Sequence, residues 1–248
     1  MNACHLALCN GKLEVLLKQW ELAKGNLTTE DVNKLFSATD NEGRTVFILA
    51  AKFCEREVIQ GIFNWTKENL TTERVFKLLL AADKKGRTVF HVAAEFKKQE
   101  VFKEIFNWAK ENLTREEVNK LLLATDNEGR TVFHVAALFC ELEVLQGIFN
   151  WAKENLTTEE VNKLLLATDN KGRTVLHVIA LLWKREVFRG IFNWAKENLT
   201  TEELNKLLLV RGNMGRTVFN VAAEFKKLDV LRGIFNWAEE NLTREDDK

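Results

Sequence analysis

The sequence predicts an all-α repeat protein of about six units, and three recurring peptides carry this prediction. Each of them returns at intervals of 43 residues along the chain of 248 residues. A fixed period of about 20 to 50 residues is typical of stacked structural repeats. The starting residues are Asn26, Asn69, Asn112, Asn155, Asn198 and Asn241 for Asn-Leu-Thr; Gly43, Gly86, Gly129, Gly172 and Gly215 for Gly-Arg-Thr-Val; and Ile62, Ile105, Ile148, Ile191 and Ile234 for Ile-Phe-Asn-Trp.

These intervals divide the chain into the units of a single repeat domain, residues 1–248. The units are 1–42, 43–85, 86–128, 129–171, 172–214 and 215–248. The first unit lacks Gly-Arg-Thr-Val, the last is shorter than the others, and no linker rich in Ser, Gly or Pro separates them. The expected architecture is therefore a solenoid, in which each unit packs only against its neighbours.

Apolar spacings of three and four residues predict three helices and a short hairpin turn in each unit. In the third unit that carries Gly-Arg-Thr-Val, the first helix is expected to follow Thr131 and to bury Val132, Val135, Ala136 and Phe139. The second is expected to begin near Leu142 and to bury Val144, Leu145, Ile148, Phe149 and Trp151. The third follows Thr157 and presents Val161, Leu164 and Leu165 on one face.

The Asn-Leu-Thr peptide has two interpretations. Asn-x-Thr is an acceptor for N-glycosylation. The same residues also suit the boundary between two helices, because Asn tolerates the left-handed conformation that ends a helix. Thr157 followed by Glu160 is a capping box that starts the next helix. We favour the helix boundary, and glycosylation stays open as the alternative.

One segment of the unit resembles the ankyrin repeat, whose pattern is Asp-x-x-Gly-x-Thr-Pro-Leu-His-x-Ala-Ala. The chain reads DKKGRTVFHVAA at residues 83–94 and DNEGRTVFHVAA at residues 126–137. The Gly-x-Leu-Glu that follows in the family is present once, from Gly11 to Glu14. The resemblance implies helical hairpins whose tips and first helices line a concave face that binds a partner protein.

Three departures from the ankyrin pattern have structural consequences. The proline of the family is valine in every full unit. The glycine between the two family helices is kept only at Gly11, and is elsewhere replaced by Cys54, Lys97, Cys140, Trp183 and Lys226. The unit is also about ten residues longer than the family's usual 33. We expect the surplus to form the third helix on the outer side; an unrelated repeat of HEAT or armadillo type is the alternative.

Composition and charge restrict the class of protein. The formal net charge is zero, which argues against nucleic acid or a membrane surface as partner, because both attract a basic excess. No apolar run approaches the roughly 20 residues of a membrane span, and the first residues do not resemble a secretory leader. The four cysteines form no Cys-x-x-Cys pair, so we expect reduced thiols and a cytoplasmic protein.

No catalytic or metal site is expected. His5, His91, His134 and His177 share one place in the repeat, but no Cys or carboxylate cluster recurs beside them to complete a metal site. The resemblance implies a structural histidine that bonds across the hairpin. No nucleotide-binding loop or nucleophile elbow is present, so we expect no enzyme and no cofactor. The tryptophans of Ile-Phe-Asn-Trp are expected to pack between units.

Comparison of the copies shows where the units differ. The most variable columns lie at the end of the first helix and in the turn after it, beside the concave face that the resemblance implies. Two consecutive units carry an apolar centre in these columns, with charged residues on either side, which is how interface hot spots are usually built. The predicted partner-binding residues are Leu138, Cys140, Leu181, Trp183, Glu95, Lys97, Glu224 and Lys226.

Three functions remain after these considerations. We favour a monomeric scaffold that binds a partner protein on its concave face. A structural or mechanical spacer, as a piece of a longer array, is the first alternative, because the units are nearly identical. A secreted, glycosylated repeat protein is the second.

Overall fold

A computed structural model describes residues 8, 18, 28–139, 142–182 and 185–241 of the chain. It divides into two compact parts, Met1–Asn127 and Glu128–Lys248. Across the described residues the structure is all-α, with fifteen helices and no strand. The all-α prediction is confirmed.

Within each part a short helix, a 14-residue helix and a nine-residue helix follow one another in a repeating order. The described helices of the first part are α3 (Thr29–Ser37), α4 (Val46–Phe53), α5 (Arg56–Asn69), α6 (Thr72–Leu80), α7 (Val89–Glu95), α8 (Gln99–Asn112) and α9 (Arg115–Leu123). Those of the second part are α10 (Val132–Phe139), α11 (Leu142–Asn155), α12 (Thr158–Leu166), α13 (Val175–Leu182), α14 (Arg185–Asn198), α15 (Thr201–Leu209), α16 (Val218–Glu224) and α17 (Leu228–Asn241).

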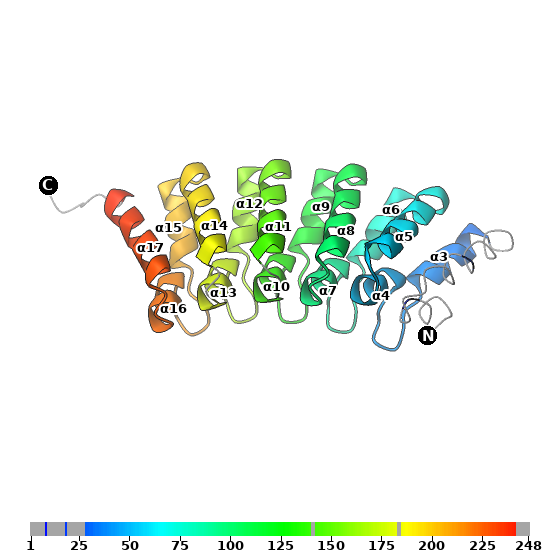
Figure 1. The fold of residues 1–248 in the computed structure, drawn as a ribbon, viewed down its shortest axis with the longest axis horizontal. Helices are drawn as coiled ribbons and strands as arrows, with labels where there is room; N and C mark the ends of the chain where they lie inside the picture. Colours follow the sequence, from blue (N-terminus) through cyan, green and yellow to red (C-terminus); the bar gives the residue numbers. More distant parts are fainter. Residues whose placement is uncertain (1–7, 9–17, 19–27, 140–141, 183–184, 242–248) are drawn as a thin grey trace. The chain divides into compact units, whose positions relative to one another are not determined.

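Equivalent helices pack side by side within each part. In the first part α4 lies against α7, α5 against α8 and α6 against α9; in the second, α10, α13 and α16 form one row and α11, α14 and α17 another. Figure 1 shows that loops project beyond the row of short helices, and that the 14-residue helices rise from its other side. The short helices have seven or eight residues, too few to be stable alone in water, so packing on both sides holds them.

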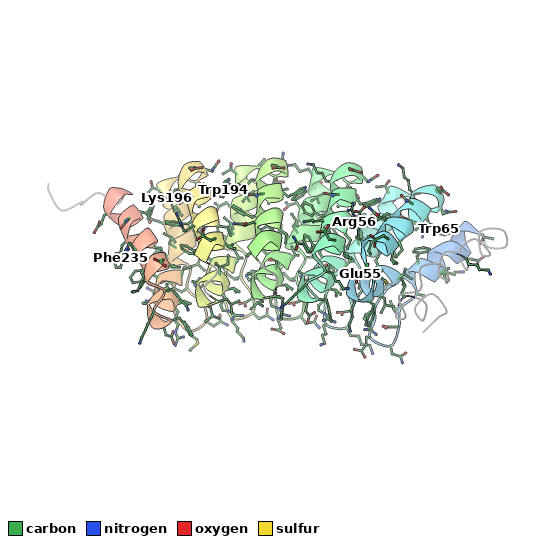
Figure 2. All side chains as sticks on the ribbon, viewed as in Figure 1. Glu55, Arg56, Trp65, Trp194, Lys196 and Phe235 are labelled. Carbon is green, nitrogen blue, oxygen red and sulfur yellow. The ribbon has the colours of Figure 1, made fainter. Side chains whose placement is uncertain are left out.

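Aromatic contacts join consecutive long helices. Phe63 of α5 stacks on Trp108 of α8, with ring centroids 4.8 Å apart, and Phe149 of α11 meets Trp194 of α14 edge to face at 5.5 Å. Such pairs contribute about 0.5–1.5 kcal/mol beyond the apolar area they bury. Trp194 and the buried Trp65 are labelled in Figure 2. The tryptophans therefore pack between helices, as predicted.

The Asn-Leu-Thr peptide forms a helix boundary by a mechanism only partly anticipated. Thr157 accepts a hydrogen bond from the backbone N–H of Glu160, whose carboxylate accepts one from the Thr157 N–H at 2.7 Å; this confirms the predicted capping box. The prediction of a left-handed backbone conformation for the asparagine was wrong at Asn69 and Asn112. Each is the last residue of its helix, and its side-chain amide donates to the carbonyl four residues earlier, at 2.7 Å and 2.8 Å.

Candidate protein-binding surface

Hairpins in both parts are held together by a buried aspartate, which the last described hairpin replaces with Gly212. In the second part, Asp169 Oδ1 accepts from the backbone N–H groups of Lys171 and Arg173, both at 2.9 Å, and Oδ2 accepts from the Arg173 guanidinium at 2.6 Å. Burial would raise the pKa of Asp169, but the hydrogen bonds from Arg173 and the backbone outweigh it, so the pKa lies below its ordinary value. Asp83 makes the same contacts with Lys85 and Arg87 in the first part.

Consecutive hairpins are joined edge to edge through their backbones. Asn213 N–H donates to the Lys171 carbonyl at 2.8 Å, and its side-chain amide donates to the Asn170 carbonyl at 2.7 Å. Gly172 has φ +68°, and a Cβ there would lie 2.8 Å from Asn213 Oδ1. Glycine is required at this place both by its own conformation and by the next hairpin.

The histidines connect a helix start to the following hairpin. His134 Nδ1 accepts from the Thr131 N–H at 3.3 Å, so the ring proton is on Nε2, which donates to the Arg173 carbonyl at 2.8 Å. His177 makes the equivalent contacts with Thr174 and with the Arg216 carbonyl. Burial lowers the pKa of His177, and the bond to Arg216 offsets only part of that effect. The predicted structural role is confirmed for these two histidines.

The structure places six of the eight predicted partner-binding residues. Leu138 and Leu181 are each the second-to-last residue of a short helix and are half-buried. Glu95 forms an ion pair with Arg87, and Glu224 forms one with Arg216 at 2.6 Å. Exposed Lys97 and Lys226 each have φ +55°. Cys140 and Trp183 lie outside the described residues.

The turn after the first helix differs between repeats, as the loss of glycine led us to expect. Cys54 has an extended backbone with φ −103°, whereas Lys97 and Lys226 adopt the left-handed conformation that glycine occupies without strain. The left-handed conformation costs a lysine roughly 1 kcal/mol.

Half-exposed apolar side chains at the ends of the short helices were not predicted by the sequence analysis. Phe139 was assigned to the buried face of its helix, yet it is 36% exposed. Its equivalents in the other described repeats, Phe53, Phe96, Leu182 and Phe225, are 39–42% exposed. Their helices end at or next to these residues, so the following turn leaves part of each side chain in solvent. The sequence signal was the invariance of an apolar residue beside the most variable columns.

A groove lies between two consecutive hairpins of the second part. It has a volume of about 370 Å³ and is bordered by α13, α16 and the turns that precede them. Its lining residues are Lys171, Arg173, His177, Leu181, Gly212, Asn213, Met214, Arg216, Val221 and Phe225. Leu181 is the one predicted binding residue that lines it. Every charged residue of the lining is basic.

Solved structures with the same fold include two that match nearly the whole chain. One belongs to the complex of the Bd0816 predatory endopeptidase from Bdellovibrio bacteriovorus with the immunity protein Bd3460, at 18% identity and a TM-score of 0.61, over 95% of this chain and 98% of that chain. Another is the ankyrin repeat protein EF0377, at 12% identity and a TM-score of 0.62, over 94% and 96%. The chain therefore has an ankyrin-like repeat fold, as the sequence resemblance implied.

Other comparisons give no further assignment. No protein-family model and no curated protein matches the chain. Among the residues that the structure describes, no helix is long and apolar enough to cross a membrane. The same residues contain no group of three or more His, Cys, Asp or Glu side chains placed to hold a metal ion.

Proposed function

We propose that the chain is a scaffold that binds a partner protein, without catalysis, on the surface formed by its hairpins and short helices. The supporting observations are the half-exposed apolar side chains, one at or next to the end of each described short helix, and the groove beside Leu181. Apolar surface next to charged side chains is typical of the buried centre and polar rim of protein interfaces.

The structural neighbours are consistent with this function. One of them is an immunity protein in complex with an endopeptidase, so a protein of this fold binds a protein partner there. Identities below one fifth carry the fold alone, and no particular partner transfers to this chain.

The proposal includes an arrangement for the whole chain. Residues 1–248 form one repeat domain with the six units given above, each of three helices and a hairpin, and the protein acts as a cytoplasmic monomer. Its partner surface includes the apolar centre of Leu138, Cys140, Leu181 and Trp183, flanked by Glu95, Lys97, Glu224 and Lys226.

Affinity capture from cell lysate tests this function. The intact chain is compared with the triple variant Leu138→Lys, Leu181→Lys, Trp183→Glu and with Leu209→Lys, in which an exposed leucine of α15 that does not line the groove is changed. Circular dichroism establishes that all three are folded. We expect the intact chain and Leu209→Lys to capture the same proteins, and the triple variant to lose them. If none of the three captures anything, the spacer function is favoured, which the near identity of the units already suggests.

A further inference from the structure

The groove of the second part has an apolar floor that its own chain leaves open. Phe225 and Met214 line it and are 42% and 75% exposed, and the half-buried Leu181 and buried Val221 continue the apolar surface. Its volume of about 370 Å³ lies within the range of roughly 300–1,000 Å³ for sites that enclose a small ligand or a few side chains.

The equivalent place in the first part is occupied by a side chain of the protein itself. Lys52 stands where the second part has Leu181, since the two are three periods apart. Its ammonium lies 4.8 Å from the ring centroids of both Phe53 and Phe96, and Phe96 is the equivalent of Phe225. A cation over an aromatic face contributes about 0.5–1 kcal/mol at exposed sites. In the second part leucine stands in place of this lysine, so Phe225 lacks this cover, and Leu182 replaces the ring of Phe53.

The charged side chains that line the groove are all basic. Arg173 is paired with the buried Asp169 and Arg216 with Glu224, but the exposed Lys171 has no ion-pair partner among the described residues. Lys226, directly after Phe225, is exposed and is kept in a left-handed conformation that glycine would occupy without strain. Positive side chains that form no ion pair within the protein favour an acidic partner. Opposite charges on two partners promote their association, whereas like charges oppose it.

We propose that this groove binds an extended segment of the partner protein in which an apolar side chain is flanked by aspartate or glutamate. The apolar side chain lies against Leu181, Met214 and Phe225, and the acidic residues meet Lys171 and Lys226. This inference rests on the proposed scaffold function, and it adds the chemistry of the partner.

Fluorescence anisotropy with three labelled peptides of equal length tests the proposal on the full-length chain. One peptide has a central leucine among aspartate and glutamate, one replaces that leucine by serine, and one keeps the leucine among lysines. We expect the first to bind at least about tenfold more tightly than either of the others. Its affinity should fall with salt, since the screening length decreases from about 10 Å at 0.1 M to about 3 Å at 1 M. Equal binding of the acidic and basic peptides would overturn the proposal.

Two variants locate the binding site. Leu181→Glu places an acid in the groove and is expected to fold, because the same column carries Glu95 and Glu224 in other repeats. Met214→Glu changes a side chain that is 75% exposed, at a place where other repeats carry Glu42 and Glu128. Each should weaken the acidic peptide about tenfold or more, because like charges oppose binding. Leu209→Glu is the matched control, and an equal loss there would contradict the assigned site.

The outcomes separate this proposal from the scaffold function. If lysate proteins are captured but the acidic peptide does not bind, the scaffold stands and the partner chemistry is wrong. If neither occurs, both fail. Sedimentation velocity of the intact chain tests whether a second copy of the chain occupies the groove. Self-association that Leu181→Glu abolishes would assign the groove to a second copy and overturn the proposal.

Discussion

The Nε2 atom of His134 lies 2.8 Å from the carbonyl oxygen of Arg173, 39 residues further along the chain. Through Nδ1 the same ring accepts the N–H of Thr131 at the start of its own helix. One neutral side chain thereby pairs with two backbone groups and joins a helix start to the next hairpin. This contact therefore depends on the protonation state of the histidine.

The stability of the protein should decrease with acidity because of His177. Its pKa is lowered from 6.5 by burial, so the unfolded chain takes up a proton at a higher pH than the folded one. The contribution of neutral His177 is complete above 6.5 and is lost as the pH falls from there toward the lowered value. Urea unfolding at a series of pH values measures this effect. His177→Asn should flatten the slope, since Asn220 accepts from Thr217 in the same way in the next repeat.

Two glycines should respond to alanine in opposite directions. Gly172→Ala is expected to destabilise by about 2 kcal/mol, through its positive φ and the contact with Asn213. Gly190→Ala should stabilise by up to about 1 kcal/mol, because this residue is inside α14 and a Cβ there meets nothing within 4 Å. Urea midpoints of the two variants give the comparison. A loss of stability in Gly190→Ala would show that the long helix requires its glycine.

Glycine should relieve the strain at Lys226. Lys226→Gly is expected to stabilise the protein by about 0.5–1 kcal/mol, because the left-handed conformation carries no steric cost for glycine. Cys54→Gly, at the equivalent but extended residue, should instead destabilise. If the groove binds an acidic segment, Lys226→Gly should also weaken the acidic peptide, so stability and affinity change in opposite directions.

Removal of a helix cap should reduce stability without a change of fold. Thr157→Ala is expected to cost about 1 kcal/mol, because Thr157 caps α12 and its partner Glu160 is left without the hydroxyl. Thr157→Ser retains the hydroxyl and should remain near the stability of the original chain. Thermal unfolding of both variants, followed by circular dichroism, distinguishes a cap from an ordinary surface threonine.

The last described repeat should open before the repeat that precedes it. Phe235 of α17, which is labelled in Figure 2, is 51% exposed. Its equivalent in α14, Phe192, is 4% exposed. Less buried apolar surface means a smaller free energy of local opening. Native-state hydrogen exchange should show faster exchange for the backbone amides of α17 than for those of α14. Equal protection of the two helices would contradict the prediction.

Much of the local structure was readable from the sequence. Thr157 and Glu160 stand three residues apart, and that spacing is sufficient for a capping box because both contacts lie within one helical turn. The ankyrin-like fold was implied by a resemblance, which the repeated histidine and the Asp-to-Gly turn carry. Asn69 was misjudged because two local arrangements, a left-handed cap and a bond to its own helix, suit the same residue.

The exposed surface was less predictable. Phe139 follows Val132 at a spacing that points to the same helix face, so the pattern alone assigns it to the core. The difference between Lys52 and Leu181 looked like ordinary variation along one column. The structure gives two members of this column different surroundings: Lys52 covers two aromatic rings, whereas Leu181 lines an open groove.

The sequence by itself determined the helical repeat, its turns and caps, since these depend on contacts a few residues apart and recur with each period. Tertiary structure alone decided which apolar side chains remain in solvent and where a groove opens. Those outcomes depend on how far each helix extends beside its neighbour 43 residues away, and the spacing of residues along one helix contains no such information.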